Sequence, residues 1–441
     1  MSKTVRIGLL GCGTVGSGLL ELLASRSSHI LNTSGVALEV AGVAVRSVSK
    51  DRDFPVADGL LTTDAEELVT SDDVDIVVEL IGGVEPARSL CVAALESGKP
   101  VITANKELLA NVGFELYELA DSNGVDFLYE AAAAAAIPIV RSLRESLVGE
   151  NISRIMGIVN GTTNYILTRM DEEGADYNAV LADAQSLGYA ERDPTADVDG
   201  FDAGAKAAIL ASVAFGKRVV AGDVYHEGIS AITQNDIAFA RNLGYAIKLL
   251  AVAELFEASD ESAESEIGVR VHPVMVPKEH PLASVRGSFN AVFVEGAAAG
   301  ELMFYGRGAG GLPTASAVLG DLVDAATNLK RGAHEPVPAG DRAVIRPIDS
   351  LQSAYYLNLE VVDSPGVLAD VAAAFGRHDV SILSMEQTSL PAGEVRAGEA
   401  EARIIFITHV AKESDLHATV ADLRKLDVVG GIANMMRVIG S

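Results

Sequence analysis

The first 135 residues alternate between short apolar runs and longer stretches with helical periodicity. Residues 5–10 form an apolar run typical of a buried strand, and residues 14–25 repeat apolar positions at helical spacing. The alternation continues through predicted strands at 38–45, 75–81, 100–104 and 125–129 and predicted helices at 86–98 and 107–120. Strands that alternate with helices predict a parallel, doubly wound sheet, so residues 1–135 are expected to form an α/β domain.

The middle of the chain, residues 136–312, has a mixed pattern. From 139 to about 255 the periodicity is mainly helical, and strand-like runs follow at 268–276 and 290–295. This pattern predicts an α+β domain.

A glycine-rich loop follows, and the chain then continues in two further segments. The loop opens a predicted helix at 313–330, which we expect to pack back on the first domain. Residues 331–353 combine prolines, glycines and mixed charge, which predicts a linker.

Residues 354–441 form a separate predicted unit. Their pattern is strand, helix, strand, strand, helix, strand, with the elements at 355–362, 367–378, 380–388, 403–410, 413–426 and 434–439. The order βαββαβ predicts a ferredoxin-like fold.

Charge and composition exclude several classes of function. The 441 residues carry a net charge of -27, which disfavours binding to nucleic acid or to an anionic membrane. The longest uncharged apolar tract, residues 131–140, is too short to span a bilayer and contains Pro138. Cys12 and Cys91 form no disulfide framework and suit a reducing compartment. We therefore expect a cytoplasmic protein whose partners are small molecules or further subunits.

A glycine motif lies between the first strand and the first helix. Gly11, Gly13 and Gly16 follow the pattern GxGxxG, and Thr14 and Val15 begin the helix. The first glycine permits a tight turn, the second lets a pyrophosphate approach the backbone, and the third allows helix and strand to pack closely. In this context the motif predicts a Rossmann-like dinucleotide site. The alternative is a glycine-rich turn without a ligand.

The end of the second strand favours NADP over NAD. An acidic residue there would bind the ribose 2′-hydroxyl, but the chain has Arg46, followed by Ser47 and Lys50. Arg46 can pair with a 2′-phosphate. The alternative is a solvated basic loop, and NAD stays possible. Thr103 and Lys106 lie at the end of the predicted strand 100–104, which would place the Lys106 amine near a nicotinamide ring. The alternative is a lysine that faces solvent.

The segment 188–206 combines many carboxylates with a lysine and then enters an apolar helix. Asp199 is a predicted N-cap, and Asp202 and Lys206 stand one turn apart on one helix face. The arrangement can hold a cationic substrate beside an amine. Its alternative is an acidic loop with a weak surface ion pair.

Taken together, these motifs resemble the homoserine dehydrogenase family. The resemblance rests on the glycine fingerprint, residues 103–106, the segment 160–167 (NGTTNYIL), the segment 188–206 and the GRGAG run at 306–310. It covers roughly residues 1–330. Residues 355–441, with DSPGVL at 363–368, resemble an ACT domain, an amino-acid-sensing module.

The resemblance implies NAD(P)-dependent interconversion of L-homoserine and L-aspartate 4-semialdehyde, on the route to threonine and methionine. It makes Lys206 the proton donor and Lys106 a bridge between cofactor and substrate, and it makes 136–312 a catalytic and dimerisation domain. Glu191, Asp197 and Asp202 would hold the substrate. The nicotinamide side would be contacted by Gly188, Glu191 and Gly308.

The family also binds a monovalent cation, sodium or potassium. The implied ligands are the Glu130 carboxylate and the carbonyls of Ala133, Ala135 and Ile137. Positions 133 and 135 are usually valine and glycine, and alanine does not readily reach positive φ. We therefore expect weak cation binding if the site needs that geometry.

The ACT-like unit implies regulation by L-threonine. Its turn, formed by Asp363, Ser364, Pro365 and Gly366, could receive an amino-acid carboxylate at the following helix N-terminus. The alternative is a purely structural dimerisation module. The resemblance implies a homodimer or homotetramer, because ACT-like modules commonly pair their sheets edge to edge and the middle domain of the family carries a dimer sheet.

Three other functions share some of these features. An acylating semialdehyde dehydrogenase needs a nucleophilic cysteine, but Cys12 lies in the phosphate loop and Cys91 inside a helix. A catalytically silent amino-acid sensor would not need Lys106 and Lys206. Another semialdehyde-reducing NADP dehydrogenase stays open.

Overall fold

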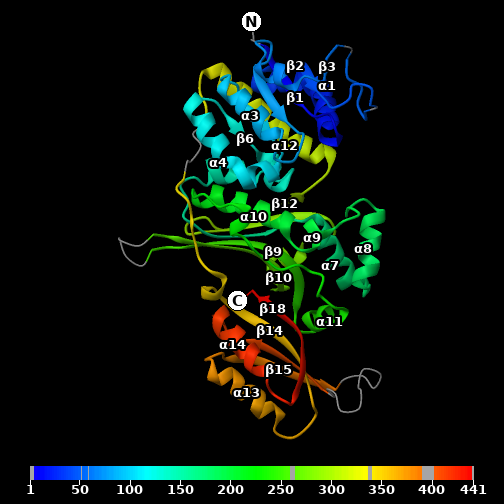
Figure 1. The fold of residues 1–441 in the computed structure, drawn as a ribbon, viewed down its shortest axis with the longest axis vertical. Coiled ribbons are helices and arrows are strands. Elements are labelled where there is room, and N and C mark those ends of the chain that lie inside the picture. Colours follow the sequence, from blue (N-terminus) through cyan, green and yellow to red (C-terminus); the bar gives the residue numbers. More distant parts are fainter. Residues whose placement is uncertain are drawn as a thin grey trace.

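The computed structural model describes residues 4–50, 52–57, 59–258, 264–335, 340–389 and 402–439. The chain forms an elongated molecule in which an N-terminal, a middle and a C-terminal part follow one another along the long axis (Figure 1). Among the described helices, none is both long and apolar enough to cross a bilayer.

A six-stranded parallel sheet forms the centre of the N-terminal part. Its strands run in the order β3-β2-β1-β4-β5-β6. The bounds are β1 (Thr4–Leu10), β2 (Ala37–Ala44), β3 (Leu61–Thr62), β4 (Ile76–Glu79), β5 (Val101–Thr103) and β6 (Phe127–Leu128). The strand order reverses between β1 and β4, where ligands of such sheets bind. The predicted Rossmann-like sheet is confirmed.

Five helices cover this sheet, one of them from a distant part of the chain. They are α1 (Thr14–Ser34), α2 (Ala65–Thr70), α3 (Ala87–Glu96), α4 (Lys106–Asn123) and α12 (Gly311–Arg331). Helix α12 follows the middle part in sequence but lies against α1 (Figure 1). Gly18 lets the two helices approach, because a Cβ there would lie 3.3 Å from the Ala315 Cβ. Val318 and Leu322 are buried in the same apolar cluster as Leu19.

The middle part is built on long antiparallel strands in the order β12-β11-β7-β9-β10. Their bounds are β7 (Ile152–Ile158), β9 (Tyr245–Phe256), β10 (Glu266–Pro277), β11 (Phe289–Gly296) and β12 (Gly300–Arg307). Two short strands, β8 (Tyr225–His226) and β13 (Val344–Ile345), pair in parallel with β10 on the edge away from β9.

The prediction that residues 139–255 are mainly helical was wrong for β7 and β9. Strand β9 is an almost continuous apolar run, and periodicity alone cannot separate such a run from a buried helix. The helices of this part are α5 (Glu130–Ala134), α6 (Ile139–Arg141), α7 (Gly161–Glu173), α8 (Tyr177–Ser186), α9 (Thr195–Val198), α10 (Phe201–Phe215) and α11 (Gln234–Asn242). Shorter helical turns span Ser142–Ser146, Ala221–Asp223 and Pro281–Ser284.

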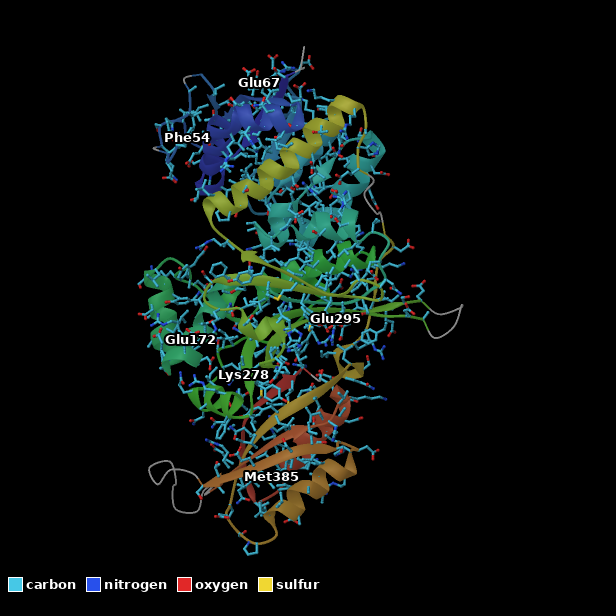
Figure 2. The ribbon with its side chains drawn as sticks, turned by 180° about the vertical axis from the view of Figure 1, so that it is seen from behind. Phe54, Glu67, Glu172, Lys278, Glu295 and Met385 are labelled. Carbon is cyan, nitrogen blue, oxygen red and sulfur yellow. The ribbon has the colours of Figure 1, made fainter. Side chains whose placement is uncertain are left out.

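The C-terminal part has the predicted βαββαβ order. It consists of β14 (Gln352–Val361), α13 (Val367–Arg377), β15 (Ile382–Ser389), β16 (Ala402–Thr408), a short β17 (Ala411–Lys412), α14 (Glu413–Leu423) and β18 (Val429–Val438). The main strands run in the order β18-β14-β16-β15, so the ferredoxin-like prediction is confirmed. Edge strand β15 carries the exposed side chains of Leu383 and Met385, the latter labelled in Figure 2.

The middle and C-terminal parts share one twelve-stranded sheet. Strand β18 pairs in parallel with β10, with Arg437 opposite Val274 and Val438 opposite Met275. Part of the segment 331–353, which was predicted as a linker, also joins this sheet, because β13 pairs with β10. A helical turn follows at Ile348–Ser350. The two parts are therefore joined by backbone hydrogen bonds and not only by a connecting loop.

Candidate active site

Helix α10 presents Asp202 and Lys206 on one face. Lys206 Nζ lies 2.9 Å from Asp202 Oδ2 and donates to the Val159 carbonyl at 2.8 Å. The side chains are only 7% and 11% exposed, which excludes the weak surface pair considered above. The helix begins after Gly200, whose φ is 86°, and no side chain caps it, so the predicted Asp199 cap was wrong.

Lys106 reaches the same carboxylate from the N-terminal part. It is the first residue of α4, and Asn105 caps this helix by accepting the Leu108 amide at 3.1 Å. Lys106 Nζ forms an ion pair with Asp202 Oδ1. Two ammonium groups that are far apart in sequence therefore share one carboxylate, at the junction of the two parts.

The two lysines keep Asp202 ionised. Burial alone would raise the pKa of this carboxyl, but the charges of Lys206 and Lys106 outweigh burial and hold the pKa well below its usual range. Asp197 shows the opposite balance. Burial raises its pKa and the neighbouring Asp202 charge adds to this, while a hydrogen bond from Asn160 partly offsets both.

Asn160 joins the two carboxylates. Its Nδ2 donates to Asp197 Oδ1 at 2.7 Å and to Asp202 Oδ2 at 2.9 Å. Its Oδ1 caps α7 by accepting the Thr163 amide at 2.8 Å. Because the cap fixes the orientation of the amide, both carboxylates are held side by side. Sequence reasoning gave Asn160 no role, although an asparagine directly before a helix is a typical N-cap.

Glu191 and Gly188 lie apart from this cluster. Both are exposed in the segment between α8 and α9, and Gly188 has a φ of 76°. Within the described residues, no hydrogen bond or ion pair connects the Glu191 carboxylate to another side chain, and its carbonyl accepts Gln185 Nε2 at 3.0 Å. The structure therefore brings together Lys106, Asp202, Lys206 and Asp197 without Glu191.

The glycine loop has the geometry of a phosphate cradle. Gly11 has a φ of 95°, and a Cβ there would lie 2.7 Å from the Leu80 carbonyl oxygen. A Cβ on Gly16 would lie 2.5 Å from the Gly11 carbonyl oxygen, so this glycine is needed for helix–strand packing. Gly13 has open space at the same position, and no side chain caps α1, which Thr14 and Val15 begin. The α1 N-terminus is thus accessible to an anion.

The loop borders a cavity of about 570 Å³ that also reaches the end of β2. Arg46, Ser47 and Lys50 line this cavity, and so does Arg52, which sequence reasoning did not select. Arg52 donates to the carbonyls of Ser47 and Lys50 at 2.6 Å each, and so fixes the basic loop. Thr103 lies below the site, where its hydroxyl donates to the buried Glu79 at 2.6 Å.

Gly308 lies where β12 leads back to α12. It is buried, and a Cβ there would collide with the Asn290 amide. Three residues on, Gly311 packs against Thr14 of the phosphate loop, with its hypothetical Cβ 2.8 Å from the Thr14 methyl group. This connection therefore lies between the dinucleotide loop and the middle part. Asn290 is buried, and neither polar atom of its side chain has a partner among the described residues.

Comparison with known proteins decides the family. Residues 138–323 match the homoserine dehydrogenase family, 11–130 its NAD-binding domain and 355–428 the ACT domain. The homoserine dehydrogenase of Mycobacterium tuberculosis (strain H37Rv) is 49% identical over 441 residues, which cover 100% of this chain and 98% of that protein. The chain belongs to the homoserine dehydrogenase family.

Solved structures of homoserine dehydrogenases agree with this assignment. The enzyme from Thiobacillus denitrificans has a TM-score of 0.90 at 40% identity and covers 99% of this chain and 98% of that one. A hyperthermophilic archaeal homoserine dehydrogenase in complex with NADPH has a TM-score of 0.62 at 31% identity and covers 73% of this chain and 98% of that one. This chain is accordingly an oxidoreductase with a nicotinamide-dinucleotide-binding domain.

The cation ligands implied by the homoserine dehydrogenase family lie in a buried turn. The Glu130 carboxylate accepts the amides of Val140 and Arg141 at 2.8 Å each. Ala135 has a φ of 49°, so alanine does adopt positive φ here, contrary to the expectation from sequence. Ala133 and Ile137 are buried beside it. A carboxylate with backbone carbonyls is an oxygen-only donor set, which suits a hard cation.

Asp321 of α12 supports this turn and was missed from the sequence. Its Oδ2 accepts the Glu130 amide at 2.8 Å, and its Oδ1 accepts Arg141 Nη2 at 3.0 Å. Burial, with the nearby Glu130 charge, raises the pKa of Asp321 to about 8. A single carboxylate within the predicted helix at 313–330 gives no sequence signal for a partner so distant in the chain.

The ACT turn of this homoserine dehydrogenase is exposed. Asp363, Ser364, Pro365 and Gly366 join β14 to α13, and Gly366 has a φ of 100° with open space at its Cβ position. Asp363 Oδ1 accepts Gln387 Nε2 of β15 at 3.4 Å. No side chain among the described residues caps the α13 N-terminus, although the amides of Val367 and Ala369 donate to the carbonyls of Ser364 and Gly366.

Proposed function

We propose that the enzyme interconverts L-homoserine and L-aspartate 4-semialdehyde, and that Lys206, Lys106 and Asp202 act directly on the substrate. The supporting observation is the shared carboxylate of Asp202, bound by two lysines at the junction of the dinucleotide domain and the middle domain. A substrate at this junction would contact both amines, and its aldehyde carbon would accept the hydride there.

In this mechanism, reduction of the aldehyde carbon moves the carbonyl electron pair onto oxygen. When bound, the reduced nicotinamide supplies the hydride. Lys206 donates a proton to the oxygen, which gives the homoserine hydroxyl, and takes it back in the oxidative direction. Lys106 adds a second positive charge that stabilises the developing alkoxide. Asp202 holds the hydroxyl end of the substrate and keeps both amines oriented, and Asp197 binds the substrate ammonium.

Glu191 completes the substrate site in this proposal. Its carboxylate lies on an exposed segment with Gly188, and a modest movement of that segment on binding would bring it toward the ammonium. A second carboxylate beside Asp197 would balance the positive charge of the substrate. Gly308 would face the nicotinamide side across the same junction.

The test measures turnover of the Lys206→Ala variant with homoserine and NADP as substrates. Turnover is monitored by the absorbance of the reduced nicotinamide. Turnover should fall by orders of magnitude while NADP binding stays nearly unchanged, since the amine acts mainly in the transition state. Lys217→Ala is the matched control, because Lys217 is 40% exposed and lies 3.9 Å from a 97%-exposed Asp341 carboxylate. Near wild-type turnover in Lys206→Ala would remove this lysine from the mechanism.

We propose NADP as the preferred cofactor, with NAD as a weaker alternative. Arg46 and Lys50 are exposed, line the cavity that contains the glycine loop, and sit where a 2′-phosphate would lie. The archaeal relative described above binds NADPH, which supports the same preference here. A sodium or potassium ion at Glu130, Ala133, Ala135 and Ile137 would stabilise the turn that connects the two domains.

We further propose L-threonine as an effector at residues 363–366, in a cytoplasmic enzyme of threonine and methionine biosynthesis. The exposed turn and the uncapped α13 N-terminus support an amino-acid carboxylate as ligand. The division into residues 1–135, 136–312 and 354–441, with α12 returning to the first domain, is our domain assignment. Exposed edge strands β12 and β15 support a homodimer or homotetramer.

A further inference from the structure

Arg437 is a residue of the ACT domain whose side chain reaches the middle domain. It lies on β18 and is 2% exposed. Its Nε and Nη2 donate to the two carboxylate oxygens of Glu413 at 2.6 Å each, and its Nη1 donates to Glu227 Oε1 at 2.8 Å. Glu413 belongs to the ACT domain and Glu227 follows β8 in the middle domain. One guanidinium thus binds a carboxylate of each domain.

Glu227 begins a short loop that packs against the substrate-side helix α9. The Ile229 amide donates to the Val198 carbonyl at 2.8 Å. Gly228 lies so close to that carbonyl that a Cβ on residue 228 would come within 2.4 Å of its oxygen. Val198 directly follows Asp197, whose carboxylate Asn160 holds beside Asp202. A displacement of the loop would therefore move α9 and Asp197 with it.

A second polar contact between the ACT domain and the middle domain is not hydrogen-bonded to α9 in the described part of the chain. Asp236 on α11 accepts Asn434 Nδ2 at 2.7 Å and the Tyr356 hydroxyl at 3.2 Å. Among the described residues, no hydrogen bond joins α11 to α9. The two contacts bind the same pair of domains. The contact through Arg437 leads directly to the loop bonded to α9, whereas the one through Asp236 reaches the site along α7, through the bond of Arg241 to Asp171.

We propose that Arg437 is a positioning residue of the catalytic site: by holding Glu227 it fixes α9 and Asp197, and it carries changes in the ACT domain to the substrate-binding carboxylates. The inference rests on the proposed function, in which Asp197 binds the substrate ammonium. Arg437 contacts neither substrate nor cofactor. Its effect should therefore be on homoserine binding, and dinucleotide binding should be unaffected.

The test is Glu227→Gln in the full-length enzyme. Glutamine keeps the shape and one acceptor oxygen, and Arg437 retains its paired bonds to Glu413, so the ACT domain should stay folded. The KM for homoserine should rise by roughly 2- to 30-fold, the range in which contacts between coupled sites usually act. The kcat should change less, and the dissociation constant for NADP should be unchanged. Inhibition by added L-threonine should weaken in the same variant.

Asn434→Ala is the matched control, because it removes a hydrogen bond of similar length between the same domains. It should leave the homoserine KM unchanged. Equal KM changes in both variants would show general loosening of the interface and overturn the proposal, as would an unchanged KM in Glu227→Gln. Arg437→Lys provides a second variant, since lysine cannot bind both carboxylates in the same way and should reproduce the KM increase. Failure of the proposed function itself would appear separately, as no homoserine-dependent reduction of NADP or NAD by the wild-type enzyme.

Discussion

Replacement of Asp202 by asparagine tests how the catalytic cluster is held together. The Asp202 carboxylate binds Lys106, Lys206 and Asn160 Nδ2. Asparagine has nearly the same shape but no charge, and its amide group can accept at only one oxygen. The substitution therefore leaves two ammonium groups without their common anion, one of them on the nearly buried Lys206.

The loss of stability expected for Asp202→Asn follows from how deeply each lysine is buried. Loss of one partner of a buried ion pair costs about 3–5 kcal/mol. Lys106 is 45% exposed, so water can solvate its ammonium group when the carboxylate is lost. Lys206 is 11% exposed, so its ammonium group loses almost all of the stabilisation that the carboxylate provided. We expect the free energy of unfolding at pH 7 to fall by about 3 kcal/mol, near the lower end of that range. Turnover should fall about a hundredfold, because both amines lose their orientation.

The pH dependence gives an independent check. The folded-state pKa of Asp202 lies below its ordinary value of about 3.9, so its stabilisation is complete above the unfolded-state pKa and is lost as the pH falls through the folded-state pKa. Urea unfolding should show a constant difference between wild type and variant from pH 8 to 5. The difference should shrink below pH 4, because there the carboxyl of the unfolded chain takes up a proton while the native carboxylate stays ionised.

Asp341→Asn is the control for a general effect of charge removal, because the Asp341 carboxylate is 97% exposed. This substitution should leave both stability and turnover unchanged. A difference in Asp202→Asn that stays constant down to pH 2, or a variant as stable as wild type at pH 7, would refute the assignment of a strongly stabilised buried carboxylate.

The cofactor, the strained turn and the assembly give three further predictions. Arg46→Asp should raise the KM for NADP far more than that for NAD, and equal changes in steady-state assays would exclude a 2′-phosphate contact. Ala135→Gly should increase the free energy of unfolding by up to about 1 kcal/mol, because glycine adopts the φ of 49° without strain, and urea unfolding showing no gain would mean the turn is relaxed. Light scattering at micromolar concentration should give the mass of a dimer or a tetramer of the 45.9 kDa chain, and a monomer mass would contradict both assemblies.

Local features of the fold could be predicted from the sequence, because they depend on neighbouring residues. The glycine loop between β1 and α1 follows from Gly11, Gly13 and Gly16, whose spacing fixes a turn, an opening and a packing contact. The ACT fold follows from six clearly alternating elements. The strand β9 could not be predicted in the same way, since its apolar run satisfies a helix and a buried strand equally well.

The site itself depended on contacts between distant residues. Asp202 and Lys206 are one helical turn apart and were visible in the sequence, but the ion pair from Lys106 and the amide bridge of Asn160 arise only from the packing of α4 and α7 near α10. Ala135 shows a further limit of prediction from the sequence. The surrounding buried residues hold a backbone conformation that the residue type alone disfavours, so tertiary packing overrides the local preference.

The edge of β10 has a consequence for the synthesis of this chain. Strand β9 pairs along one side of β10, whereas the other side is covered in sequence by β13 at residues 266–267, β8 at 270–271 and β18 at 274–275. Because β8 is made before β10, whereas β13 and β18 are made after it, this edge of β10 stays partly open until the ACT domain has also been synthesised. Open strand edges promote association between chains. The pairing of β18 thus covers an edge at which incompletely synthesised chains would otherwise associate.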